Sequence, residues 1–277
     1  MNNRIYMRYP NGLKKALTLS YDDGVKQDIR LIEILNAHGI KATFNLNSGG
    51  YSKDDSTRRM TKEKATEVYT NCGHEIAVHS YSHPHLEELP PAEAAYEILE
   101  DRKCLEEQFG GIIRGMAYPY GTYNDTVVEI LKSSGILYAR TIVSTKKFDI
   151  PTDWLRLPAT CHHNSSDLMP LAEKFVKYDR EKPALFYLWG HSYEFDDNDN
   201  WDVIENFCEY IGGKDDVWYA TNIEIFEYME AYNRLIWGID AKTVKNPSST
   251  DVWISISRNR EPSQLVEIKA GATVTIN

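Results

Sequence analysis

The sequence contains little cysteine and no long apolar run. Its four cysteines are widely separated and form no Cys-x-x-Cys pair, so they are too few for a disulfide scaffold, and we expect reduced thiols that lie mostly in the core. No apolar stretch approaches the roughly 20 residues that span a bilayer, and residues 1–15 include no apolar segment typical of a secretory signal. We therefore expect a cytoplasmic protein with no membrane partner.

Positive charge is also scarce. Lysine and arginine total 31 against 41 aspartate and glutamate residues, a net charge of -10 at pH 7. A surface with this balance repels phosphate backbones, which excludes nucleic acid as a partner. The remaining composition, 42% hydrophobic and 26% charged, is that of a globular chain with a full core. A length of 277 residues fits one large domain with at most a small appendage.

Strand-like and helix-like segments alternate along most of the chain. Ala16 to Tyr21 has β character, and residues 28–38 follow with apolar side chains at helical spacing before the helix-stopping Gly39. About seven such units succeed one another up to residue 236. This alternation predicts an α/β fold of parallel strands with crossover helices, and seven units fit a barrel better than a small open sheet. We assign residues 1–238 to this barrel.

The pattern changes after Gly238. Residues 252–258, 265–270 and 272–276 alternate with period two, and turn-forming residues separate them. We predict a small C-terminal antiparallel β appendage over residues 239–277. The acidic stretch of residues 196–200 lacks the pattern of a calcium loop, and we expect an ordinary loop there.

Polar side chains follow four of the predicted strands. They lie in the segments Ser20 to Gly24, His79 to His83, Tyr118 to Gly121, and Gly190 to His191. In parallel α/β folds the functional groups gather at the carboxyl ends of the strands. We therefore expect these four segments to converge on one rim of the barrel.

The first two segments have the composition of a catalytic metal site. Asp22 and Asp23 point different ways from the backbone, so one carboxylate can bind an ion while the other takes protons. His79 and His83, four residues apart, complete a His/His/Asp set that leaves open positions on a Zn²⁺-like cation, which would activate water and polarise a carbonyl. A separate histidine on the opposite rim would then protonate the leaving group. Taken singly, Asp-Asp-Gly is also typical of a solvated turn and H-x-x-x-H arises by chance, so the prediction depends on their joint placement.

Residues 16–237 resemble the polysaccharide deacetylase family. Ser20-Tyr21-Asp22-Asp23-Gly24 is similar to that family's Thr-Phe-Asp-Asp-Gly motif, and residues 73–84 (GHEIAVHSYSHP) are similar to its Gly-His-Glu-Ile-Gly-Asn-His-Thr-x-x-His-Pro block. The resemblance implies a distorted (β/α)7-type barrel and a divalent metal, usually zinc.

The resemblance also implies residue roles. It places the metal on Asp23, His79 and His83, makes Asp22 the general base, and makes His191 the general acid. In Pro119-Tyr120-Gly121, the backbone N–H of Tyr120 would bind the oxyanion of the tetrahedral intermediate. Trp154 would form a wall against the acetyl methyl group, although a core aromatic is an equally good reading of that residue. His74 is expected to play a structural role, and His85, His162 and His163 are loop candidates for substrate contact.

One position departs from the family pattern. The arginine that commonly pairs with the base is replaced by Ala117. Arg114, Arg140 and Arg156 are candidates for a displaced guanidinium, and Arg156, just after Asp153-Trp154, is the first of them.

These features favour a metal-dependent hydrolase that removes acetyl groups from an N-acetylated sugar or glycan. The alternatives are an O-acetyl carbohydrate esterase, an intracellular small-molecule amidase, and a non-catalytic carbohydrate-binding relative, which Ala117 suggests. The appendage would serve as a dimer contact, a glycan-binding lid or an extension of the sheet. The sequence leaves the glycan and the oligomeric state open.

Overall fold

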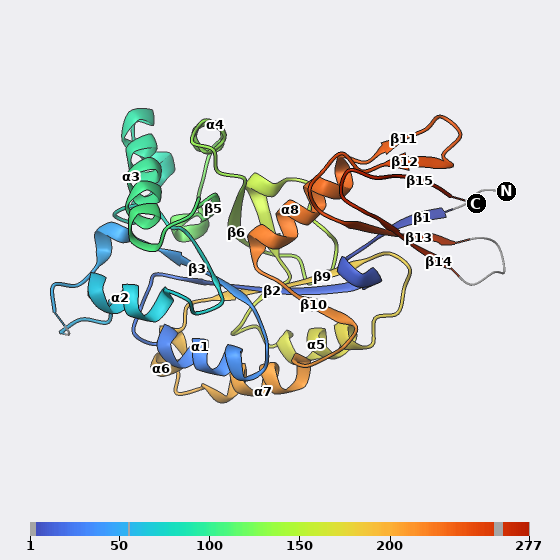
Figure 1. Cartoon of the computed structure of the whole chain (residues 1–277). Helices are drawn as coiled ribbons and strands as arrows, with labels where there is room; N and C mark the ends of the chain where they lie inside the picture. Colours follow the sequence, from blue (N-terminus) through green and yellow to red (C-terminus); the bar gives the residue numbers. More distant parts are fainter. Residues whose placement is uncertain (1–3, 55, 258–262, 277) are drawn as a thin grey trace.

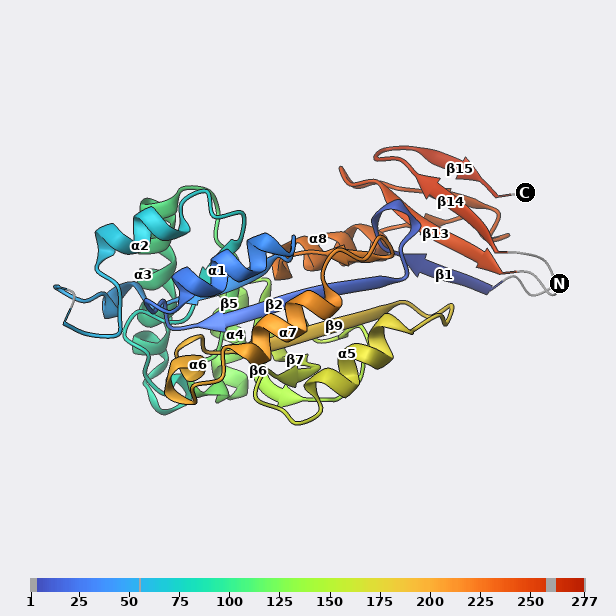
Figure 2. The same cartoon turned by 90° about the horizontal axis from the view of Figure 1, so that it is seen from below.

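Parallel strands form the centre of the molecule in the computed structural model, which describes residues 4–54, 56–257 and 263–276 (Figure 1). The parallel strands that follow one another around this centre are β2 (Lys15–Asp22), β3 (Ala42–Leu46), β4 (Glu75–Val78), β5 (Gly115–Ala117), β6 (Tyr138–Ser144), β7 (Leu157–Ala159), β8 (Cys161–His162) and β9 (Ala184–Gly190). A further short strand, β10 (Val217–Tyr219), pairs with the amino half of β2. The longest pairing joins β2 to β9, which lie side by side (Figure 2).

One short segment closes the strands into a barrel. β7 pairs with β6 and β8 pairs with β9, yet β7 and β8 are separated only by Thr160, whose N–H donates to the carbonyl of Tyr187 at 2.8 Å. Residues 157–162 therefore occupy a single strand position between β6 and β9. With this segment counted once, the described residues form a barrel of seven strand positions. The barrel is distorted because the register of β6 against β7 shifts between Arg140 and Ser144. The predicted (β/α)7-type fold is confirmed.

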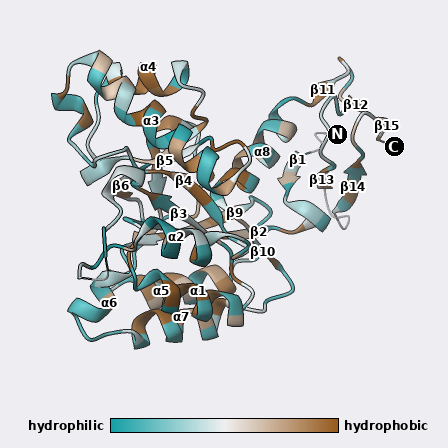
Figure 3. Cartoon of the chain, turned by 60° about the vertical axis from the view of Figure 1, so that its left-hand side comes forward, coloured by the Kyte–Doolittle hydropathy of each residue, from teal (hydrophilic) through white to brown (hydrophobic). Residues whose placement is uncertain are grey.

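Helices cover the outside of the barrel. They are α1 (Asp28–Ala37), α2 (Lys62–Tyr69), α3 (Pro91–Phe109), α4 (Asp125–Ser133), α5 (Leu168–Val176), α6 (Tyr193–Asp197), α7 (Asp202–Ile211) and α8 (Asn222–Asn233). Local sequence sets several starts: the side chains of Thr61 and Asn124 accept from the backbone N–H three residues on, and Thr221 with Glu224 forms a capping box. The helices carry both apolar and polar segments (Figure 3). None of the described helices is long and apolar enough to cross a bilayer.

Alternation along the strands separates an apolar exterior from a polar interior. On β2, Leu17 and Leu19 belong to the buried cluster that packs against the helices. The intervening side chains of Thr18 and Ser20 face the barrel interior, where Thr18 hydrogen-bonds Asn222 at 2.7 Å and Ser20 accepts from Asn45 at 2.8 Å. This interior polarity matters because the same face of β2 ends in Asp22.

The amino-terminal end of α8 closes the bottom of the barrel. Glu75, at the start of β4, accepts hydrogen bonds from the Tyr138 hydroxyl at 2.7 Å, the Thr43 hydroxyl at 2.8 Å and the Ile223 N–H at 2.9 Å. Burial disfavours the ionised form of Glu75 and raises its pKa to about 7. The hydrogen bonds from these neutral donors lower the pKa, but by less than burial raises it. The bottom is therefore closed by neutral hydrogen bonds.

The appendage consists of two small antiparallel sheets. One contains β1 (Arg4–Arg8), β13 (Val252–Ser257) and β14 (Gln264–Ile268), and the other contains β11 (Ile236–Trp237), β12 (Thr243–Lys245) and β15 (Thr273–Thr275). Val244, Ile254 and Ile268 form a fully buried core between them, shared with Leu235 after α8. The antiparallel appendage is confirmed, but the participation of β1 was not anticipated. The predicted strand residue Arg258 lies outside the described residues.

Two element predictions were wrong. The strand–helix alternation was expected to continue to residue 236, but its last helix, α8, ends at Asn233, because residues 236–237 pair with β12 instead. Residues 196–200 were expected to form a loop, but the first two belong to α6. The second difference bears on the site, because α6 carries Glu194.

Candidate active site

A pocket of about 340 Å³ opens at the carboxyl ends of the strands. All four predicted segments reach it, and it is lined by Asp22, Asp23, His79, His83, Tyr118, Tyr120, Gly121, Ile142, Trp189, His191 and Tyr193. The convergence follows from topology, since parallel strands direct their carboxyl ends to one rim. Pro119 is buried beneath Tyr120 in the same turn.

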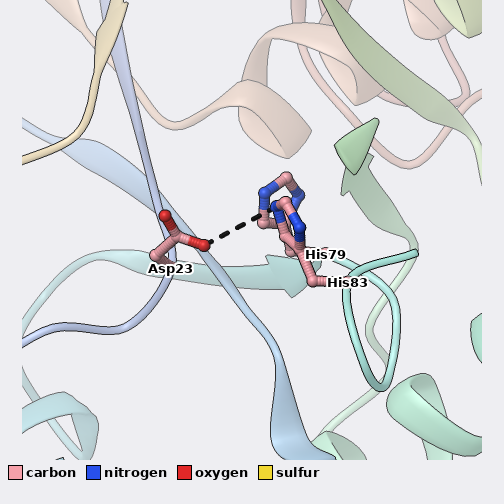
Figure 4. Close-up of side chains that lie close together, drawn as sticks. All are labelled: Asp23, His79 and His83. Atoms are coloured by element: carbon pink, nitrogen blue, oxygen red, sulfur yellow. Dashed lines mark ion pairs between the residues drawn. The ribbon is translucent and has the colours of Figure 1, made fainter. Parts of the chain in front are cut away.

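Asp23, His79 and His83 point toward one another (Figure 4). One ligand atom from each lies within 4.8 Å of the others, and the Asp23 Oδ1 to His83 Nε2 distance is 3.7 Å. Tetrahedral zinc ligands about 2.1 Å from the ion lie roughly 3.4 Å apart, so a small contraction brings the three atoms to coordination distance. Backbone turns aim these side chains, because Asp23 and His83 both have positive φ, at 84° and 61°.

The two imidazoles are prepared to act as neutral ligands. The Nδ1 of His79 donates to the carbonyl of Ala117 at 2.8 Å, which leaves the lone pair of Nε2 facing the pocket. Burial lowers the pKa of His79 and lowers that of His83 to about 4, so both rings are unprotonated at neutral pH. A carboxylate and two neutral imidazoles that converge beside an open pocket fit a divalent ion.

Asp22 is a buried, charged carboxylate. One oxygen accepts from Asn45 Nδ2 at 2.8 Å, and the other accepts from the guanidinium of Arg140. Burial alone would raise the pKa of Asp22, but Arg140, His79 and His191 outweigh it and lower this pKa to about 2. Its Oδ2 lies 3.8 Å from His79 Nε2 and 3.9 Å from His191 Nε2. The side chain therefore holds an acceptor beside the three-ligand set.

The prediction for Arg156 was wrong. Its guanidinium binds Asp153 and Asp125 at the surface, at 2.9 and 2.6 Å, and is 34% exposed. The cation beside Asp22 is Arg140, on β6, which is 1% exposed and lies under the ring of Trp189. β6 neighbours β5, which carries Ala117, and Ala117 pairs in register with Arg140. The cation that pairs with Asp22 therefore lies on β6, one strand away from the position on β5 where the family pattern has its arginine.

His191 follows β9, the strand that pairs with β2, and is held by Glu194. Its Nδ1 lies 3.1 Å from Glu194 Oε1, so its Nε2 faces the pocket. Burial tends to lower the pKa of His191, but the hydrogen bond to Glu194 and the charge of Asp22 raise it. The other oxygen of Glu194 lies 3.3 Å from His162 Nε2 and 2.8 Å from His163 Nε2. The two histidines therefore support Glu194 from behind the pocket.

Tyr120 projects over the mouth of the pocket. It adopts a left-handed conformation, with φ 57°, and its ring is 52% exposed. The ring stacks on His85 at 3.9 Å and meets the edge of His83 at 4.5 Å. His85 therefore lies beside Tyr120, and its contact with substrate stays a prediction, whereas His74 accepts from the Ala42 N–H and lies outside the pocket lining.

The prediction for Trp154 was also wrong. Its ring packs edge-on against Phe226 at 5.3 Å, and Trp154 is not among the residues that line the pocket. The core reading of this residue holds, because the segment after β6 crosses the bottom of the barrel rather than its mouth. The tryptophan that lines the pocket is Trp189, at the end of β9.

Sequence reasoning missed Asn45, Glu194 and Arg59. The alternation of β3 gives a signal for Asn45, since the inward position one residue before the strand's end pairs in register with Asp22. Glu194 follows His191 by one helical turn, but only if that segment is helical. Arg59 lies in a loop and binds the carboxylate of Asp23 at 3.1 Å, which no local pattern indicates.

Comparison with known proteins bears on these residues. A family model described as polysaccharide deacetylase matches residues 9–139, which include Asp22, Asp23, His79, His83 and Tyr120. The match confirms the resemblance to the polysaccharide deacetylases. A chitooligosaccharide deacetylase from Azorhizobium caulinodans is 26% identical over 50% of this chain and 63% of its own. A peptidoglycan-N-acetylglucosamine deacetylase from Listeria monocytogenes is 30% identical over 42% of this chain and 23% of its own.

The matched part spans less than two thirds of each of these curated relatives. Solved structures share the fold. A family 4 carbohydrate esterase from Streptomyces lividans aligns over 75% of this chain and 93% of its own, with 17% identity and a TM-score of 0.53. A carbohydrate esterase domain of a multidomain xylanase from the hindgut metagenome of Trinervitermes trinervoides aligns over 79% of this chain and 92% of its own, with 16% identity and a TM-score of 0.55.

Proposed function

We propose that the protein is a metal-dependent hydrolase that removes acetyl groups from an N-acetylated sugar or glycan. The observation that carries the proposal is the arrangement of Asp22 and His191 around the Asp23, His79 and His83 set, inside one pocket at the rim of the barrel. An anionic proton acceptor and a separate proton donor beside a cation site are what acyl transfer to water requires.

The chain's own residues supply proton transfer. A divalent ion, zinc by the donor set, would supply Lewis acidity that activates water and polarises the acetyl carbonyl when bound by Asp23, His79 and His83. Asp22 accepts the proton of the attacking water, since its carboxylate is ionised at neutral pH and Arg140 and Asn45 hold it in place. His191 donates a proton to the departing amine, because Glu194 orients its ring and raises its pKa.

The walls of the pocket suit an acetyl group. The backbone N–H of Tyr120 stabilises the negative charge that develops on the carbonyl oxygen. Ile142 and Trp189 supply apolar surface for the methyl group, in the role that the sequence assigned to Trp154. A pocket of about 340 Å³ admits the acetylated sugar at the barrel mouth and leaves the rest of a glycan outside.

The other candidates share most of this chemistry. An O-acetyl esterase and a small-molecule amidase need the same base, cation and oxyanion donor, and differ in the leaving group. The hypothesis of a non-catalytic carbohydrate-binding protein depended on Ala117, which stands where the family has an arginine. Arg140 weakens that hypothesis, because its guanidinium pairs with Asp22 instead. The curated relatives are named as deacetylases of chitooligosaccharides and peptidoglycan, which favours the N-acetyl substrate.

Acetate release tests the proposal. The metal-stripped chain is supplied with Zn²⁺ and given chitooligosaccharides, O-acetylated xylan and a small non-sugar acetamide. We expect acetate from the chitooligosaccharides and none after addition of a chelator. Acetate released chiefly from xylan would identify an O-acetyl esterase. Acetate released chiefly from the acetamide would identify a small-molecule amidase. No acetate from any substrate, with Zn²⁺ bound, would favour a binding protein.

A further inference from the structure

Arg59 lies against the candidate metal site, although it belongs to none of the four motif segments. It is in the loop between residue 50 and α2, and residues 58–59 pair with the chain just after Asp23: Lys26 N–H donates to the Arg58 carbonyl at 3.0 Å, and Val25 and Arg59 form an isolated bridge. This pairing carries the Arg59 guanidinium to the pocket wall, where it is 29% exposed.

The guanidinium holds Asp23 at two points. One nitrogen donates to the Asp23 carbonyl at 2.5 Å, and the other donates to Asp23 Oδ1 at 3.1 Å. The two bonds restrain both the backbone and the side chain of a residue whose φ of 84° is unfavourable for a non-glycine residue. A carboxylate oxygen has two lone pairs, so Oδ1 can accept from Arg59 and still bind an ion.

Asn47 extends this contact to the second ligand segment. Its Oδ1 accepts from Arg59 at 2.8 Å, and its Nδ2 donates to the carbonyl of His79 and to that of Ser80, the latter at 2.9 Å. Asn47 is 2% exposed, and Ser80 has a φ of 63°. Arg59 and Asn47, which we call the Arg59–Asn47 clamp, thus join the end of β2 to the end of β4.

The geometry points to the Arg59–Asn47 clamp as the device that sets the metal affinity of this chain, by holding Asp23 and His79 in ligating positions before the ion arrives. This inference rests on the proposed function. Two effects oppose each other: a guanidinium near the ion repels it, whereas a ligand already in place costs no ordering free energy on binding. The clamp makes the second effect the larger one, because it fixes two ligand segments through one buried amide.

Zinc affinity measured on the metal-stripped full chain tests the clamp. Competition for Zn²⁺ with a chromophoric chelator gives the affinity without an activity assay. Loss of hydrogen-bonding partners of metal ligands typically costs ten- to a hundredfold in affinity, so we expect that loss for Arg59→Met. Asn47→Asp keeps the acceptor for Arg59 but loses both donors to the β4 segment, and it should also weaken Zn²⁺ binding.

The neighbouring Arg58 provides a matched control. It pairs with Asp197 and lies over the ring of Tyr193, without contacting Asp23, so Arg58→Met should leave zinc affinity within about twofold of the wild type. Arg59→Lys separates the effect of charge from that of positioning. Lysine keeps the positive charge but lacks the two guanidinium nitrogens that donate together to Asp23, so we expect weaker Zn²⁺ binding than in the wild type. If Arg59→Met binds Zn²⁺ as tightly as wild type, or more tightly, the clamp is refuted.

The outcomes separate the two proposals. A wild-type chain that binds no Zn²⁺ contradicts the proposed function, whereas tight wild-type binding that Arg59→Met and Asn47→Asp leave unchanged contradicts the clamp alone. Circular dichroism of the metal-free proteins reports whether each variant is folded. Should Arg59→Met not fold, the comparison of Arg59→Lys with Arg58→Lys decides, since equal affinities would refute the clamp.

Discussion

The two ends of the barrel interior each contain a buried carboxylate, and the pKa values of these two groups are shifted in opposite directions. At the mouth, Asp22 faces Arg140 and two histidines, and its pKa is lowered to about 2. At the bottom, Glu75 has only hydroxyl and N–H donors, and burial raises its pKa to about 7. One end therefore maintains a charge out of water, while the other favours neutrality. A group kept charged at such cost is typical of a functional site.

The comparison is tested most strongly by removing the charge at the mouth. Asp22→Asn should lower kcat/KM for acetate release about a thousandfold, since a general base contributes on the order of 10² to 10⁴. Zinc binding should persist, because Asp23, His79 and His83 are intact. Glu75→Gln, the matching change at the bottom, should leave kcat/KM nearly unchanged. Comparable activity in Asp22→Asn and the wild type would rule out Asp22 as the base.

Removing the cation instead should damage stability. Arg140→Met leaves Asp22 buried without its partner, a change that typically costs about 3–5 kcal/mol in the free energy of unfolding. Denaturant unfolding at neutral pH measures this loss. The double variant with Asp22→Asn should recover part of it, because no buried charge remains. A double variant no more stable than Arg140→Met would argue that Arg140 acts mainly through packing against Trp189.

Arg140→Lys gives a kinetic version of the same test. A weaker cation contact raises the pKa of Asp22, so more of the base is protonated at low pH. The acidic limb of the kcat/KM profile should therefore move to higher pH. An unmoved acidic limb would show that Arg140 does not set the ionisation of Asp22.

Glu194 should affect the alkaline limb. A general acid works below its pKa, and Glu194 raises the pKa of His191 against the effect of burial. In Glu194→Gln this pKa falls, so the alkaline limb of the kcat/KM profile should move to lower pH. Glu87→Gln, which alters the rim pair with His85, should leave the limb in place. The assignment fails if both variants shift the limb equally.

At the bottom of the barrel the expected effect is on the pH dependence of stability. A carboxyl group whose folded-state pKa is raised from 4.5 to about 7 binds more protons in the folded than in the unfolded chain. Stability should therefore fall as pH rises from about 5 to 7, by at most about 1.4 kcal/mol per pH unit from this group. Glu75→Gln should flatten this part of the stability curve relative to wild type. Parallel curves for the two proteins would contradict the neutral state of Glu75.

Much of this arrangement could be predicted from sequence. The alternating segments and the spacing of His79 and His83 predicted the barrel and the residues that meet at its mouth, because parallel strands bring their carboxyl ends together. Arg140 was one of three candidates, and no local pattern could rank them, since the choice depends on the strand order that places β6 next to β5. The place of Trp154 could not be predicted for a different reason, because it depends on the path of the segment between β6 and β7.

Glu194 and Arg59 mark the limit of such reasoning. Glu194 belongs to a segment read as partly loop, and its contact with His191 exists only because that segment turns helical. Arg59 reaches Asp23 from 36 residues away through a loop with little periodicity. Contacts set by loop conformation leave no repeat in the sequence, whereas contacts set by strand alternation do.

The pairing of β1 with β13 has a consequence for how the chain folds. Arg4 and Ser257 are partners, so this sheet forms only after the whole barrel sequence has been synthesised. Closing so long a loop is entropically costly and slows folding. Until then β1 is a free edge able to pair with other strands. The experimental sign of this delay would be early aggregation of nascent chains. Deletion of residues within β1 should reduce that aggregation.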